Sequence, residues 1–274
     1  MYVIGGHGYV GSRVVADAVG QRLDVEVVTR TGVPGLGRSS VAWPDLEALI
    51  QRQSHPSVVW LLDGAKHAET DRLAELLSWA PRGTHVVAVS TCTVYGDQRG
   101  ALCTERTPLQ LVTPHARIKA TSEQMLANSG LSWCVLRLGA LYGIDDRGIR
   151  ADRIQKWVTQ AAQTGVVTVP EPSHWRGWLH REQAARALVR AASRRTTGVF
   201  NVASANMTFA DAAGTAAGLF DASVESDGKP DPSNYQVDST AARQCDLLDE
   251  HPAEDLPSCT RAFAGARTPA DPQP

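Results

Sequence analysis

A glycine-rich turn near the start of the chain is the feature that most constrains the fold. Within residues 3–11 a short apolar run leads into three glycines at G-x-x-G-x-x-G spacing, and residues 12–21 place their apolar side chains on one helical face. Glycines at this spacing permit a tight strand-to-helix turn, bring a pyrophosphate close to the backbone and let helix pack on strand. The first amides of the helix are suited to binding phosphate. The predicted cofactor contacts in this dinucleotide site are Gly5, Gly8, Tyr9, Val10 and Gly11.

Apolar runs that predict buried strands alternate with segments of helical periodicity along the first half of the chain. The predicted strands after the first are residues 25–29, 41–43, 58–62, 86–90 and 133–136. Strands that alternate with helices predict a parallel sheet with right-handed crossovers, and ligands bind at the carboxyl ends of such strands. We therefore expect an α/β fold with a Rossmann-type parallel sheet flanked by helices. The residues expected to share one crevice with the glycine turn are Arg30, Asp63, Gly64, Ser90 and Thr91.

The regular alternation loosens after Gly143, and this change predicts a division of the chain. We expect an NAD(P)-binding domain over residues 1–143 and a smaller substrate-binding lobe over residues 144–274. The two parts should pack closely, with elements able to cross back from one to the other. The last forty or so residues are rich in proline and are predicted to be loop-rich.

The end of the second predicted strand bears on the choice of cofactor. In this fold an acidic residue there binds the ribose hydroxyls of NAD, whereas an arginine suits the additional phosphate of NADP. Arg30 stands at this position, with Arg38 nearby. The sequence therefore favours NADP, with NAD as the alternative. The competing interpretation is that Arg30 is a solvated loop residue.

Composition and charge exclude several other kinds of partner. The formal net charge is only −2, which gives no support for nucleic acid or a membrane surface as a partner. No apolar stretch approaches the ~20 residues that span a bilayer, and Met1 leads straight into the first predicted strand, so we expect a cytoplasmic protein with a small-molecule substrate. The five cysteines form no C-x-x-C pair, and we expect neither a metal site nor disulfides.

Several ordered segments resemble the motifs of the extended short-chain dehydrogenase/reductase family, also called the NAD-dependent epimerase/dehydratase family. Residues 90–96 are similar to S-[ST]-x-x-V-Y-G, residues 136–143 to L-R-x-x-N-V-Y-G, residues 176–185 to R-x-[FW]-[VI]-H-V-x-D-x-A and residues 198–204 to G-x-x-Y-N-V-G-S. The resemblance spans nearly the whole chain. It implies a Rossmann fold, an NAD(P) cofactor, and a homodimer formed through the helices predicted near residues 69–79 and 114–128.

The resemblance also implies roles for individual residues. Thr91 stands where the family has the Ser or Thr that binds the substrate oxygen, and Lys119 where it has the lysine that holds the nicotinamide ribose. Asp45 matches a contact to the adenine. Arg176 matches the arginine that binds the diphosphate of a nucleotide sugar. Tyr95, close to Thr91 in sequence, is expected to contact the substrate as well.

The family's catalytic tyrosine is replaced by His115, and the asparagine that assists substrate binding by Ala140. His115 lies in the first turn of a predicted helix, one turn before Lys119, so the helix dipole and the lysine both disfavour its imidazolium form. A neutral imidazole can replace the phenol as general acid/base. The alternative is that the position has lost its chemistry and the chain is a cofactor-binding sensor or scaffold.

We therefore predict an NAD(P)-dependent oxidoreductase of the epimerase/dehydratase type. Its substrate would carry a hydroxy or keto group and be a sugar nucleotide, a sugar-like compound or a natural-product intermediate. The predicted catalytic residues are Thr91, His115 and Lys119.

Overall fold

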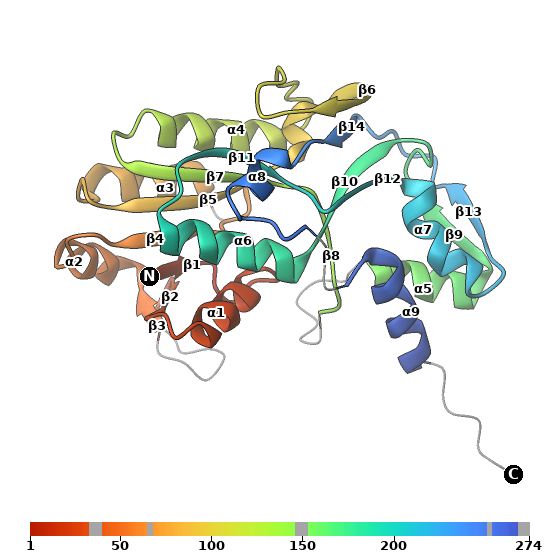
Figure 1. Ribbon diagram of the computed structural model, residues 1–274, viewed down its shortest axis with the longest axis horizontal. Coiled ribbons are helices and arrows are strands. Elements are labelled where there is room, and N and C mark those ends of the chain that lie inside the picture. Colours follow the sequence, from red (N-terminus) through yellow and green to blue (C-terminus); the bar gives the residue numbers. More distant parts are fainter. Residues whose placement is uncertain (33–39, 65–67, 146–152, 251–253, 268–274) are drawn as a thin grey trace, which may run out of the picture.

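The computed structural model describes residues 1–32, 40–64, 68–145, 153–250 and 254–267. Its central layer is a parallel sheet of seven strands in the order β11-β7-β5-β4-β1-β2-β3 (Figure 1). The strands are β1 (Tyr2–Ile4), β2 (Glu26–Thr29), β3 (Ser40–Ala42), β4 (Ser57–Trp60), β5 (His85–Thr91), β7 (Ser132–Leu138) and β11 (Gly198–Val202). This sheet confirms the predicted α/β fold of the Rossmann type.

Helices cover both faces of the sheet. Figure 1 shows α1 and α6 on one face and α3 and α4 on the other. The bounds of these four helices are α1 (Gly11–Gly20), α3 (Glu69–Trp79), α4 (Pro114–Ala127) and α6 (Arg181–Arg194), and the short helix α2 (Leu46–Gln51) packs in the same core as α3. In β1, Val3 packs in the same core as Val14 of α1, whereas Tyr2 and Ile4 pack in the core that contains Leu73 of α3. Because successive strand residues point to opposite faces, burial of both faces requires the continuous apolar runs seen in the sequence.

The second part of the molecule has a separate aromatic core. A three-stranded sheet in the order β12-β10-β8 contributes residues to this core, and β9 pairs with β13 in parallel. The Trp178 ring lies at its centre, with edge-to-face contacts to Trp157 at 5.7 Å and Phe209 at 5.8 Å between ring centroids. Its elements are β8 (Ala140–Tyr142), α5 (Arg153–Thr164), β9 (Val166–Val169), β10 (Trp175–His180), β12 (Ala205–Thr208), α7 (Phe209–Gly218), β13 (Ser223–Ser226) and α9 (Leu256–Arg267).

The chain crosses back to the first sheet after residue 180. Helix α6 contributes Leu188 to the core beneath α1, and β11 pairs in parallel with β7. Residues 181–202 therefore pack with the seven-stranded sheet of the first part, although they follow the predicted boundary at residue 143. The division into two domains at that boundary stays a prediction.

The last forty or so residues, predicted to be loop-rich, also contain regular elements. They contain α9, α8 (Thr240–Gln244) and β14 (Asn234–Val237), which pairs with β6 (Asp97–Cys103), a strand that the sequence did not indicate. Most of β6 is exposed, so it lacks an apolar run. Pro257 lies in the first turn of α9, where the missing amide of proline breaks no helical hydrogen bond.

No helix among the residues described above is long and apolar enough to cross a membrane.

Acid should destabilise this fold because two buried histidines resist protonation. Burial lowers the pKa of His85 and of His180 to about 4, whereas histidine in an unfolded chain titrates near ~6.5. Between these values the unfolded chain binds more protons, so the free energy of unfolding should fall as pH falls, by up to about 1.4 kcal/mol per pH unit for each histidine. Urea unfolding at a series of pH values measures this slope. In His85→Gln the slope should be smaller than in the wild type; an equal slope would remove His85 from the explanation.

Candidate active site

The glycine turn after β1 has the shape that the sequence predicts. Gly5 adopts a φ of +85°, and the Gly8 amide donates to its carbonyl at 3.0 Å. A Cβ on Gly11 would lie 2.2 Å from the Gly5 oxygen, so that position accepts only glycine. A Cβ on Gly8 would meet only the Gly5 oxygen, at 3.2 Å. The side of Gly8 is therefore open, as the approach of a pyrophosphate requires.

The residues between the glycines join the turn to the second part of the molecule. Tyr9 is buried, and its hydroxyl donates to the Gly143 carbonyl at 2.7 Å. The Arg181 guanidinium lies 4.4 Å from the centre of the Tyr9 ring and donates to the Ile144 carbonyl. Val10 is the residue before α1. Tyr9 thus fixes the predicted pyrophosphate loop against the segment after β8, a role that the glycine motif alone did not indicate.

The two residues predicted to contact the adenosine end are both exposed. Arg30 directly follows β2 at its carboxyl end. Asp45 lies in a single 3₁₀ turn, η1 (Trp43–Asp45), before α2. Asp45 does not cap α2 with its side chain, because its backbone is already helical and its carboxylate makes no cap hydrogen bond. Arg38 lies outside the described residues.

Lys119 is buried in an ion pair that the sequence did not reveal. Its ammonium lies 2.9 Å from Glu69 Oε2 and donates to the Leu62 carbonyl at 2.7 Å. Glu69 is also buried and accepts from the Gly64 amide at 2.8 Å and the Ser122 hydroxyl at 2.9 Å. These contacts use two of the three ammonium hydrogens of Lys119. Its predicted contact with the nicotinamide ribose would use the third.

His115 lies half-exposed in the first turn of α4. The Thr113 side chain caps this helix by accepting from the Ala116 amide at 3.1 Å, and Pro114 is the first helical residue. Burial is the main cause of a lowered His115 pKa, and the Lys119 charge adds to it. The imidazole is therefore neutral at pH 7, in agreement with the prediction, although burial has the largest effect.

Thr91 ends β5 and caps the turn that follows it. Its Oγ1 accepts from the Thr93 amide at 3.2 Å and lies 2.9 Å from the Thr93 hydroxyl. The side chain is half-buried. Its predicted hydrogen bond to a substrate oxygen would come from the same hydroxyl.

Tyr95 is fully buried, and its hydroxyl is held by two protein groups. Its hydroxyl donates to Asn201 Oδ1 at 2.6 Å and accepts from Arg137 at 3.0 Å, and burial raises its pKa. Arg137 is in turn held by the Glu123 carboxylate at 2.6 Å. The predicted contact between Tyr95 and substrate is therefore not supported by the structure. The tyrosine instead supports the turn that carries Thr91.

Arg176, predicted to bind a diphosphate, is already neutralised. It is 6% exposed and forms an ion pair with Asp231. Its other donors bind the Ser233 carbonyl at 2.6 Å and the Trp175 carbonyl at 2.7 Å. The guanidinium also lies 5.1 Å from the centres of two aromatic rings. These rings belong to Phe209 and Tyr235.

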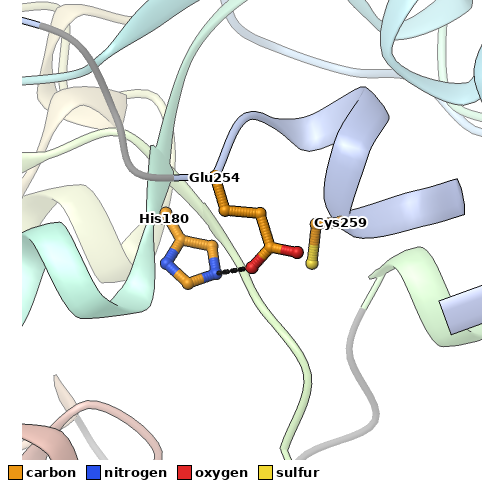
Figure 2. Close-up of side chains that lie close together, drawn as sticks. All are labelled: His180, Glu254 and Cys259. Atoms are coloured by element: carbon orange, nitrogen blue, oxygen red, sulfur yellow. Dashed lines mark ion pairs between the residues drawn. The ribbon is translucent and has the colours of Figure 1, made fainter. Parts of the chain in front are cut away.

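A group of three possible metal ligands lies at the end of β10 (Figure 2). The donor atoms of His180, Glu254 and Cys259 are within 4.8 Å of one another, and His180 Nε2 is 3.7 Å from the glutamate. However, Nδ1 of His180 accepts from the Glu182 amide at 3.3 Å as the cap of α6. In a neutral imidazole this bond places the proton on Nε2. That tautomer points a hydrogen towards Glu254 and disfavours a metal ion.

Comparisons with known proteins identify relatives of this chain. The model of the NAD dependent epimerase/dehydratase family matches residues 1–203. No curated protein matches the chain. Among solved structures, dTDP-glucose 4,6-dehydratase from Bacillus anthracis in complex with NAD superimposes with a TM-score of 0.76 at 17% identity, over 96% of this chain and 94% of that one. UDP-N-acetylglucosamine 4-epimerase from Bacillus cereus superimposes with a TM-score of 0.74 at 20% identity, over 100% of this chain and 98% of that one. Pal from Bacillus thuringiensis superimposes with a TM-score of 0.75 at 16% identity, over 96% of this chain and 97% of that one. At these identities the structures show a shared fold.

Gly8→Val should abolish cofactor binding and leave the fold intact. The added side chain would occupy the open side of the glycine turn, where it meets no core atom. Calorimetric titration with NADH and NADPH measures binding, and a thermal melt measures stability. Gly20→Val is the matched control, since a Cβ on Gly20 at the far end of α1 has no neighbour within 4 Å. Normal binding by Gly8→Val would show that the cofactor lies elsewhere.

Proposed function

Because the chain belongs to the NAD-dependent epimerase/dehydratase family, we propose that it is an NAD(P)-dependent oxidoreductase acting on a hydroxy or keto group of a carbohydrate-type substrate. The observation that carries this proposal is the register of α4. It sets His115 one turn before Lys119, and Lys119 is anchored to the Leu62 carbonyl just after β4. Family membership supports turnover over the alternative of a sensor or scaffold.

The proposed chemistry divides among three side chains. The bound nicotinamide supplies the acceptor or donor of a hydride. Thr91 holds the substrate oxygen by a hydrogen bond. During oxidation, the neutral His115 takes the proton of the substrate hydroxyl; during reduction, its imidazolium returns a proton to the carbonyl oxygen. Lys119 orients the ribose with its remaining hydrogen.

Two classes of substrate follow from different observations. The solved neighbours include a UDP-N-acetylglucosamine epimerase and a dTDP-glucose dehydratase, which make a nucleotide sugar the first candidate. The second is a sugar-like compound without a diphosphate, favoured by the Arg176–Asp231 ion pair. A diphosphate would have to displace the Asp231 carboxylate from a buried guanidinium. Ala140 offers no side-chain amide to assist it.

The proposed cofactor preference rests on Arg30. It is exposed at the carboxyl end of β2, and the two residues that follow it are Thr31 and Gly32, so no carboxylate stands next to it. A planar guanidinium suits the 2′-phosphate of NADP. The expected homodimer through α3 and α4 stays a prediction.

His115→Ala should lower kcat by ~10²–10⁴-fold with little change in cofactor affinity, the usual effect of losing a general acid/base. The assay incubates the enzyme with NAD⁺ or NADP⁺ and a panel of UDP-glucose, UDP-N-acetylglucosamine, dTDP-glucose and the sugars without nucleotide, and products are separated chromatographically. His115→Tyr restores the family's phenol and should keep part of the activity. His55→Ala, at an exposed histidine, is the control. Full turnover by His115→Ala would refute the assignment.

The protein should bind NADPH more tightly than NADH, and Arg30→Ala should remove the difference. Calorimetric titration of both cofactors against wild type and variant measures this preference. Arg22→Ala, at an exposed arginine beyond α1, is the control and should behave as the wild type. Equal affinities in the wild type would identify Arg30 as a solvated loop residue.

A further inference from the structure

The loop after β4 is fixed on both sides of Asp63 by the buried ion pair. Lys119 holds the carbonyl of the preceding residue, Leu62, at 2.7 Å, and Glu69 holds the amide of the following residue, Gly64, at 2.8 Å. Both charged side chains are at least 96% buried. The backbone at Asp63 is thereby tied to α3 and α4, while its own carboxylate is 63% exposed.

The same ion pair places His115 beside this carboxylate. His115 and Lys119 share a face of α4, so the helix that delivers the ammonium to Leu62 also delivers the imidazole to the loop. His115 Nδ1 lies 3.8 Å from Asp63 Oδ1. A Cβ on Gly64 would lie 3.5 Å from the same nitrogen, and Gly64 has a φ of +50°. Glycine at this position lets the loop bend towards the imidazole.

Building on the proposed function, we propose that Asp63 is a positioning residue for His115, and that the two form a carboxylate–imidazole pair that replaces the tyrosine of the family. The carboxylate faces Nδ1, which leaves Nε2 for exchange of the proton with substrate. At 3.8 Å the contact is an ion pair when the imidazole is protonated, and too long for a hydrogen bond when it is neutral. Asp63 therefore acts on the imidazolium that forms when His115 accepts a proton.

The charges around His115 explain why a carboxylate is needed there. Burial and Lys119 lower its pKa, and Asp63 and Glu69 oppose them. Glu69 already shares its charge with Lys119, its ion-pair partner at 2.9 Å. Asp63 is the carboxylate outside that pair. Without it the imidazolium would be disfavoured further, and the supply of protons for reduction would fall.

The pH titration of the His115 ring resonances by NMR tests this pair without any substrate. The full-length protein is titrated, and His115→Asn identifies the resonances by their loss. Asp63→Asn should lower the His115 pKa by several tenths of a unit to about one unit, the effect of a unit charge at this distance in a largely aqueous setting. Asp63→Glu should restore part of the shift. Asp71→Asn, on the exposed side of α3, is the matched control and should leave the pKa unchanged. An unchanged pKa in Asp63→Asn would overturn the proposal.

The pH profile of kcat/KM on the substrate panel then tests whether the Asp63–His115 pair acts on the proton that is exchanged during turnover. The limb due to His115 should move to lower pH in Asp63→Asn by the amount that NMR measures. A limb that stays in place while the NMR value falls would show that another group carries the limb, and it would overturn both the role of Asp63 in turnover and the assignment of His115 as general acid/base. If the wild type turns over none of the panel, the proposed function fails on those substrates, while the NMR titration still decides whether Asp63 and His115 are coupled.

Discussion

The buried ion pair between Glu69 and Lys119 organises the region in which the chemistry would take place. Burying two charges is costly, and attraction alone seldom offsets the desolvation. Here the amide of Gly64, the hydroxyl of Ser122 and the carbonyl of Leu62 supply the additional hydrogen bonds that make the pair tolerable. The pair joins α3, α4 and the loop after β4 into one unit. The helix register that brings Lys119 to its partner also decides where the half-exposed imidazole one turn earlier lies.

A second buried network supports the neighbouring turn. Arg137 of β7 binds Glu123 of α4 and the hydroxyl of Tyr95, and that hydroxyl binds Asn201 of β11. The network therefore links two adjacent strands to the turn that begins at Thr91. In this arrangement Tyr95 is a buried residue with a raised pKa, and its hydroxyl is engaged by Arg137 and Asn201. His115 is the side chain that we propose exchanges the proton.

In the second part of the molecule, the protein itself occupies the guanidinium of Arg176. Arg176 keeps the position that the family motif predicts, yet Asp231, Ser233 and two aromatic rings enclose its guanidinium. A guanidinium that is already paired with a buried carboxylate attracts a diphosphate less strongly than an unpaired guanidinium would. The motif residue thus contributes to the packing of β10, whereas its value for substrate recognition depends on whether the Asp231 contact opens.

The sequence alone determined the features that depend on near neighbours in the chain. The glycine turn, the alternating strands and helices, and the shared helix face of His115 and Lys119 follow from local geometry and apolar periodicity. Exposed β6 was missed because its pairing partner, not its own pattern, makes it a strand. The contacts of the site needed the tertiary structure, since Arg176 meets Asp231 across 55 residues and Lys119 meets Leu62 across 57. No spacing rule predicts which buried charge will meet which carboxylate, because the folded sheet and the helices packed on it decide that contact.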